Sequence, residues 1–254
     1  MSGGHLHALH VHGHSPVHRM APEAKVAALL AFVLGVVATP REAIWAFGIH
    51  AFLLLAVVTF AELPIGFVLR RMTVEIPFVA FALLLPFLGG GPETQVLGIG
   101  MSVEGLWGAW NILAKATLGV GASVTLVATT EIPDLLHGFD RLRVPKLFTA
   151  IAGFMVRYID VIAGELQRTR TAMTARGHDP RWLWQVGPLA TAAGALFVRS
   201  YERGERVHQA MVARGYDGRM PVMDERRATA IEWAAAMALP FTVWMTVLLV
   251  LVTP

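Results

Sequence analysis

The sequence predicts an all-α integral membrane protein with about five transmembrane helices and long cytoplasmic amphipathic coupling helices. Composition is the first reason: 55% of the residues are hydrophobic, 15% are charged and the mean hydropathy is +0.57, which is too apolar for an ordinary soluble domain. The second reason is pattern, because apolar stretches of helix length alternate with proline and glycine, and one long basic region interrupts them. The absence of cysteine excludes disulfides and thiolate metal sites.

Residues 1–22 predict a His-rich flexible cytoplasmic tail without an apolar face for docking. The tail holds six of the ten histidines: His5, His7, His10, His12, His14 and His18. Imidazoles this close together chelate ions such as Ni²⁺, Co²⁺ or Zn²⁺. A solvated tail without a metal role and a remnant of cloning are the alternatives, so these histidines are a speculative metal site. No basic leading region or cleavage site marks a signal peptide.

Residues 23–130 predict a four-helix membrane region, since a bilayer core of ~30 Å needs about 20 helical residues per span. The expected spans are 24–38, 43–63, 74–88 and 103–130, with a loop at the Gly-Gly-Gly-Pro run 89–92. Asn111 and Lys115 lie inside the fourth span, where an amine is costly unless it has a partner. We interpret Lys115 as a buried structural contact; a role in transport is the alternative.

Residues 131–227 break this pattern and hold 15 of the 21 basic residues. Only Arg41 lies in the first loop and no basic residue lies in the third, so the positive-inside rule places the amino terminus and this region in the cytoplasm. Residues 228–254 then contain the last transmembrane helix, which ends outside. Glu131, Asp134 and Asp140 are read as capping and solvated charge on a short interfacial helix.

Two long amphipathic helices are expected within the basic region. The first spans 145–176, roughly 45–50 Å at ~1.5 Å per residue, because apolar residues recur at intervals of three and four and Pro145 suits a first turn. The second spans 188–214. Both are expected to be too charged to cross the membrane, so they lie near its face or cross each other.

Each of these helices ends in the same short motif. Residues 172–179 read Ala-Met-Thr-Ala-Arg-Gly-His-Asp and residues 210–217 read Ala-Met-Val-Ala-Arg-Gly-Tyr-Asp, identical at six of eight positions at an offset of 38. The glycine suits the left-handed residue that follows a helix. The candidate site consists of Ala175, Arg176, Gly177, Ala213, Arg214 and Gly215, supported by Arg168, Arg206, Asp179 and Asp217.

If only one copy were present, its arginine could be explained by the helix dipole. A cation near the negative, carboxyl end of a helix stabilises the helix by ~0.3–1 kcal/mol. Two near-identical copies favour two equivalent prongs that meet two equivalent partners. No phosphate-binding loop, His-Glu-x-x-His motif or nucleophile motif is present, so we expect no enzyme and assign any ATP hydrolysis to partner proteins.

The paired Ala-Arg-Gly motifs, with Thr129-Thr130 before the basic region, Pro145 opening it and one span after it, resemble the transmembrane coupling (T) subunit of energy-coupling-factor (ECF) ABC importers, the EcfT/CbiQ family. The resemblance covers about residues 24–252. It implies a multi-pass protein of the bacterial inner membrane with no cofactor of its own, which joins two cytoplasmic ABC ATPases, holding ATP and Mg²⁺, to a substrate-binding membrane subunit. Membrane lipid surrounds it and nucleic acid is not a partner.

By this resemblance Arg176 and Arg214 dock into the two ATPases, and the chain is most similar to the cobalt-uptake branch, with nickel and vitamin importers left open. A self-sufficient membrane metal channel or carrier is the alternative from a different class. It needs acidic or histidine ligands within the spans, where His50 is almost alone. A membrane-embedded enzyme needs a catalytic set, and none is visible.

Overall fold

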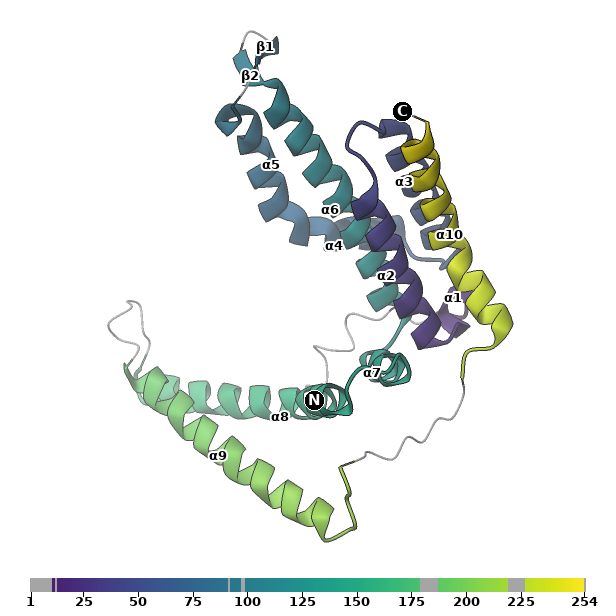
Figure 1. The fold of residues 1–254 in the computed structure, drawn as a ribbon. Helices are drawn as coiled ribbons and strands as arrows, with labels where there is room; N and C mark the ends of the chain where they lie inside the picture. Colours follow the sequence, from purple (N-terminus) through teal and green to yellow (C-terminus); the bar gives the residue numbers. More distant parts are fainter. Residues whose placement is uncertain are drawn as a thin grey trace. The chain divides into compact units, whose positions relative to one another are not determined.

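The protein is an all-α integral membrane protein, and the part of the chain that the structure describes adds one short β-hairpin to the helices (Figure 1). The computed structural model describes residue 11 and residues 13–90, 92–96, 99–178, 187–218 and 227–253. The elements are α1 (Pro16–Arg19), α2 (Pro22–Ala38), α3 (Ile44–Phe60), α4 (Ile65–Arg71), the 3₁₀ helix η2 (Met72–Glu75), α5 (Ile76–Leu88), β1 (Glu93–Val96), β2 (Ile99–Ser102), α6 (Val103–Thr129), α7 (Ile132–Arg141), α8 (Lys146–Ala175), α9 (Gly187–Val212) and α10 (Ala230–Val252).

The chain divides into two compact units. The membrane unit, residues 8–142 and 226–254, contains α1 to α7, the hairpin and α10. The two-helix unit, residues 143–225, contains α8 and α9. The basic region of the sequence therefore folds largely as a unit of its own, and only α7 belongs with the spans.

Helix α2 is the central element of the membrane unit, in contact with α6, α7 and α10. Its core side chains Phe32 and Val36 pack with Phe47, Leu118 and Val243 from α3, α6 and α10. Helix α10 approaches α2 so closely that a Cβ on Gly35 would lie 2.6 Å from Val243 Cγ1. Glycine at this position is what permits the contact, as is common where membrane helices touch.

The expected spans agree with α2, α3, α6 and α10 to within a few residues, whereas the third span is longer than expected. Helices α4, η2 and α5 follow one another from Ile65 to Leu88, 24 residues in all. The charged residues near its middle made the first half read as a loop. In the structure Glu75 is buried and accepts a hydrogen bond from Thr117 Oγ1 at 2.5 Å, and Arg71 lies 4.5 Å from the Phe67 ring centroid.

The hairpin between α5 and α6 was not predicted. Strands β1 and β2 pair antiparallel, with Thr94 opposite Met101, and Figure 1 shows them joining two helices that lie side by side. Strands of four residues after a glycine-rich run carry almost no sequence signal. At the α2–α3 turn, Arg41 forms an ion pair with Glu104 at 3.0 Å. Arg41 also donates a hydrogen bond to Glu42, which holds the pKa of the Glu42 carboxyl below its usual range.

Of the flexible tail that we expected for residues 1–22, the structure describes residue 11 and residues 13–22, and these are packed within the membrane unit. The Val11 amide donates to the Ala128 carbonyl at 3.0 Å, and Ser15 is 2% exposed and caps α1. Val11 and Val17 pack against a buried cluster that includes Val58 and Ala128. These two valines supply the apolar contact that the histidine-rich composition obscured. His5, His7, His10 and His12 lie outside the described residues.

Among the described residues, four helical stretches are long and apolar enough to cross a membrane: 65–88, α6, α8 and α10. Helix α3 is apolar but only 17 residues long. The presence of α8 in this group differs from the expectation that it is too charged to span, because its charges gather toward its carboxyl end. Length and hydropathy alone therefore do not exclude α8 from the membrane, and the five-span topology stays a prediction.

Candidate functional site

The candidate site is the pair of helix ends that carry the repeated motif. At the end of α8, the amides of Arg176 and His178 both donate to the Met173 carbonyl at 3.0 Å, and the Gly177 amide donates to the Thr174 carbonyl at 3.0 Å. Gly177 has a φ of +79°. The bond from His178 back to Met173, with a left-handed glycine between them, is the Schellman pattern of helix termination.

The end of α9 repeats this geometry residue for residue. The amides of Arg214 and Tyr216 donate to the Met211 carbonyl at 3.0 Å, the Gly215 amide donates to the Val212 carbonyl at 2.9 Å, and Gly215 has a φ of +84°. The sequence repeat is therefore a structural repeat, and the prediction that both motifs end helices with a left-handed glycine is confirmed.

Both arginines are presented in the same way. Arg176 and Arg214 are exposed, whereas the methionine three residues before each is half-buried. Neither guanidinium has a hydrogen-bond or ion-pair partner among the residues that the structure describes. A Cβ on Gly177 or Gly215 would meet nothing within 4 Å, so each glycine serves the backbone conformation and not a close contact.

The two helices that carry the motifs are joined by one carboxylate, which sequence reasoning did not single out. Glu165 of α8, with its side chain 15% exposed, binds Arg199 Nε at 3.2 Å and Arg203 Nη2 at 3.4 Å from α9. Positions 165 and 203 are separated by 38 residues, the offset of the repeat. The helices thus meet at equivalent positions, and one clue was that each helix carries a charge of opposite sign there.

The supporting residues that the structure describes are all exposed. Arg168 and Arg206 occupy equivalent positions of the repeat, and Arg206 lies 3.9 Å from Glu202 one turn earlier. Asp217 is exposed, and Asp179 lies outside the described residues.

The described part of the chain holds no group of three or more metal-ligating side chains. Of the tail histidines, His14 is exposed, and His18 has both ring nitrogens engaged. Nε2 of His18 donates to the Val11 carbonyl at 3.0 Å, so Nδ1 accepts from Ser15 Oγ at 2.7 Å. Coordination of a metal by His18 in this conformation would have to break one of these bonds.

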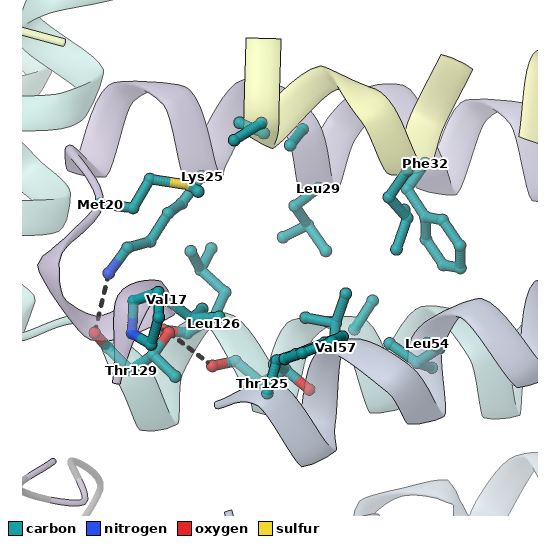
Figure 2. Close-up of a pocket in the computed structure, with 17 residues that line it drawn as sticks. Val17, Met20, Lys25, Leu29, Phe32, Leu54, Val57, Thr125, Leu126 and Thr129 are labelled. Carbon is teal, nitrogen blue, oxygen red and sulfur yellow. Dashed lines mark hydrogen bonds between the residues drawn. The ribbon is translucent and has the colours of Figure 1, made fainter. Parts of the chain in front are cut away.

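The membrane unit contains an apolar cavity of about 340 Å³ between α1, α2, α3, α6 and α10 (Figure 2). Figure 2 shows Lys25 reaching from α2 toward Thr129 at one end of it. The Lys25 ammonium donates to the carbonyls of His18 and Thr129 at 3.2 and 3.0 Å and to Thr130 Oγ1 at 3.1 Å. All three N–H donors of the ammonium are therefore used within the protein. They connect α2 to α1 and to the carboxyl end of α6.

The polar residues of the other spans also make internal contacts. Lys115 donates to the Val37 carbonyl at 2.8 Å, which agrees with a structural contact, although the side chain is half-buried and not buried. His50 is fully buried and its Nε2 lies 2.8 Å from Thr246 Oγ1. One oxygen of Asn111 is buried without a partner among the described residues.

The family described as CbiQ, cobalt transport protein, matches residues 13–223. The chain belongs to this family. The cobalt transport protein CbiQ of Rhodobacter capsulatus is 30% identical over 179 residues, which cover 68% of this chain and 73% of the relative.

Relatives with another name match more of the chain. The energy-coupling factor transporter transmembrane protein EcfT of Staphylococcus aureus is 24% identical over 256 residues, covering 92% of this chain and 91% of the relative. The protein of the same name from Heliobacterium modesticaldum is 27% identical over 218 residues, covering 80% and 81%. The family resemblance drawn from the paired motifs is confirmed, and the chain is a multi-pass membrane protein of the CbiQ/EcfT family.

Proposed function

We propose that the chain is the energy-coupling transmembrane subunit of an ECF-type ABC importer. In this role it links two cytoplasmic ATPases, which bind ATP and Mg²⁺, to a separate substrate-binding membrane subunit. The observation that carries the proposal is the pair of exposed arginines, Arg176 and Arg214, on two helix ends with the same hydrogen-bond pattern. Two equivalent prongs suit a partner that is itself a pair of equivalent subunits.

The chemistry of the prongs fits an acidic groove. A guanidinium presents a rigid fork of donors that pairs with a carboxylate through two hydrogen bonds, which a lysine ammonium cannot do. The Schellman ends hold both forks on stiff helices of 30 and 26 residues. A force applied at the ATPases would then be carried along the helix, because a helix bends far less readily than a loop.

The apolar side of α8 fits a second partner in or on the membrane. Leu147, Phe148 and Met155 are 67%, 64% and 67% exposed. Exposed apolar surface of this extent marks an interaction site. A hydrophobic membrane subunit is the occupant that matches both this surface and the apolar character of the helix.

Cobalt(II) is the proposed substrate because the matching family and the Rhodobacter relative carry that name. A nickel or vitamin importer is the other assignment within the same family of transporters. The amino terminus is proposed to face the cytoplasm of a bacterial cell with the protein in its inner membrane, since the basic residues gather on one side.

The test is charge reversal of the two prongs in a strain that expresses the chain with its ATPases. Arg176→Glu and Arg214→Glu should each weaken copurification of the ATPases and cobalt uptake, because loss of a buried charged hydrogen bond costs ~2–5 kcal/mol. The double variant should lose both while its amount in the membrane stays unchanged. Arg170→Glu, an exposed arginine on α8 outside the motif, is the matched control.

If the arginines only complement the helix dipoles, each change costs about 1 kcal/mol and transport survives. A double variant that still copurifies with ATPases and takes up cobalt at the wild-type rate would show that the prongs are not the coupling site.

A further inference from the structure

A buried carboxylate in the first turn of α2 has no place in the function described so far. Glu23 is 4% exposed and lies in the first turn, next to Pro22 at the helix start. A carboxylate is favoured near a helix amino terminus, but burying it is costly unless its oxygens are hydrogen-bonded. The partners of Glu23 are the last residue of α7 and a residue just before α10.

The first partner ends α7. Arg141 Nη1 lies 3.2 Å from both oxygens of Glu23, and the guanidinium side chain is 19% exposed. Helix α7 approaches α2 closely here, because a Cβ on Gly138 would lie 3.1 Å from the Glu23 amide nitrogen. The pair is thus largely shielded from water, where an ion pair is stronger than at the surface.

The second partner precedes α10. The Ala228 amide donates to Glu23 Oε1 at 2.7 Å. The next residues form a capping box, in which the Glu232 amide donates to Thr229 Oγ1 at 3.3 Å and the Thr229 amide donates to Glu232 at 2.8 Å. The capping box fixes the start of α10, and Glu23 accepts a hydrogen bond from Ala228, the residue just before the capping box.

These two partners flank the two-helix unit in the sequence. The chain leaves the membrane unit after Leu142, and the described residues from 227 onward belong to that unit again. Arg143, the first residue beyond, has a φ of +65°, a left-handed conformation that few residues other than glycine adopt. One carboxylate on α2 thus holds the chain on both sides of the segment that carries Arg176 and Arg214.

We propose that Glu23 is a positioning residue for energy coupling, which fastens both chain connections of the two-helix unit to α2. The point where the chain leaves the membrane unit and the point where it re-enters are then held to α2 by the same carboxylate, so a force that arrives at either point acts on α2. The inference rests on the proposed function, but its physical basis, the hydrogen bond to Ala228, is measurable without transport.

The test uses the complete complex in proteoliposomes, with Glu23→Gln and Glu23→Ala in the chain. Glu104→Gln is the matched control, since Glu104 also binds an arginine distant in sequence, Arg41 at 3.0 Å, but lies at an exposed position away from the connections. Three quantities are measured: hydrogen–deuterium exchange of the Ala228 amide, ATP hydrolysis, and cobalt(II) taken up per ATP hydrolysed.

We expect Glu23→Ala to raise exchange at Ala228 at least tenfold, to leave ATP hydrolysis within twofold of wild type, and to lower cobalt uptake per ATP at least tenfold. Glu23→Gln keeps an oxygen acceptor and should fall between, so it serves if the alanine variant does not fold. Arg141→Met frees one connection only and should cause a smaller loss. Glu104→Gln should match wild type in all three measurements.

A purely structural role would lower complex yield and all activities together, without changing uptake per ATP. Unchanged exchange at Ala228, or raised exchange with unchanged uptake per ATP, overturns the inference while the proposed function stands. Failure of the wild-type chain to copurify with ATPases overturns the proposed function, and the inference with it, whatever the exchange data show.

Discussion

The two units of this protein differ in how far they bury their side chains. In the membrane unit Glu23, Lys25 and Glu75 are all at most 8% exposed, and each is hydrogen-bonded within the unit. In the two-helix unit neither α8 nor α9 has a buried residue, and large apolar side chains such as Phe148 and Phe197 are 64% and 72% exposed. One unit buries charged side chains and pairs them by hydrogen bonds, whereas the long helices of the other bury no residue at all.

The difference indicates which unit can define its own structure. Buried, hydrogen-bonded charges fix helices of the membrane unit against one another, because any other arrangement would leave a charge without partners. The two-helix unit has no core, and its described inter-helix polar contact is the ion cluster at Glu165. Such a unit lies at the low-stability end of a protein, where regions that move in function are found.

The largest effect that we predict is an all-or-none labelling pattern, which decides on which side of the membrane the two-helix unit lies. Because the chain has no cysteine, single cysteines can replace Ser2, Thr94, Ser200 and Thr253 and be probed with an impermeant thiol reagent on intact cells. Five spans with the amino terminus inside predict labelling of Thr94→Cys and Thr253→Cys, with Ser2→Cys and Ser200→Cys protected.

Permeabilised cells, in which all four positions should react, are the control for this pattern. If α8 crosses the membrane, as its length and hydropathy permit, Ser200→Cys becomes accessible from outside and Thr253→Cys becomes protected. That result would separate the motifs from cytoplasmic ATPases and contradict the proposed function.

Sequence reasoning succeeded where a pattern is local. The doubled motif, the glycines with positive φ and the ends of most spans follow from neighbouring residues. The capping box at Thr229 and Glu232 was also visible and would have placed the start of α10 two residues later than predicted.

It failed where a residue acts through distant contacts. Glu23 and Lys25 were not singled out, because most of their partners lie more than a hundred residues away. Two charges in the first turn of a membrane helix were a usable signal, since each needs a partner there. The pairing of Glu165 with Arg203 could not be predicted for the same reason, because only the folded chain brings positions 165 and 203 together.

The second prediction compares two lysines of the membrane unit. Lys25→Met keeps the aliphatic stem but removes a donor shared by three acceptors, whereas Lys115→Met removes one bond, to the Val37 carbonyl. At ~1 kcal/mol for each hydrogen bond and more where a buried acceptor is left unpaired, Lys25→Met should cost about 3 kcal/mol and Lys115→Met about 1 kcal/mol. Thermal unfolding in detergent should show a drop in Tm of about 6–12 °C for the first and 2–4 °C for the second.

Equal losses for the two lysines would mean that the three hydrogen bonds of Lys25 stabilise the membrane unit no more than the single bond of Lys115. Buried charges would then be a weaker distinction between the two units. A Lys25→Met protein that still unfolds like wild type would mean that the three hydrogen bonds of Lys25 do not stabilise the membrane unit.

The smallest predicted effect concerns the ion cluster that joins α8 to α9. Glu165→Gln weakens pairing with Arg199 and Arg203, whose side chains are 51% and 39% exposed, so water screens the pair and we expect a loss of about 1 kcal/mol or less. Glu202→Gln is the matched control, because Glu202 lies 3.9 Å from Arg206 within α9 and does not join the helices. Hydrogen–deuterium exchange of α9 amides in the isolated chain should rise up to about fivefold for Glu165→Gln and stay unchanged for Glu202→Gln.

If both variants exchange like wild type, the cluster does not hold the helices together, and the unit would depend for its shape entirely on the partners that cover its apolar faces. If Glu165→Gln instead exchanges about a hundredfold faster, this one carboxylate holds more than a screened ion pair can, and the two-helix unit would be as self-contained as the membrane unit.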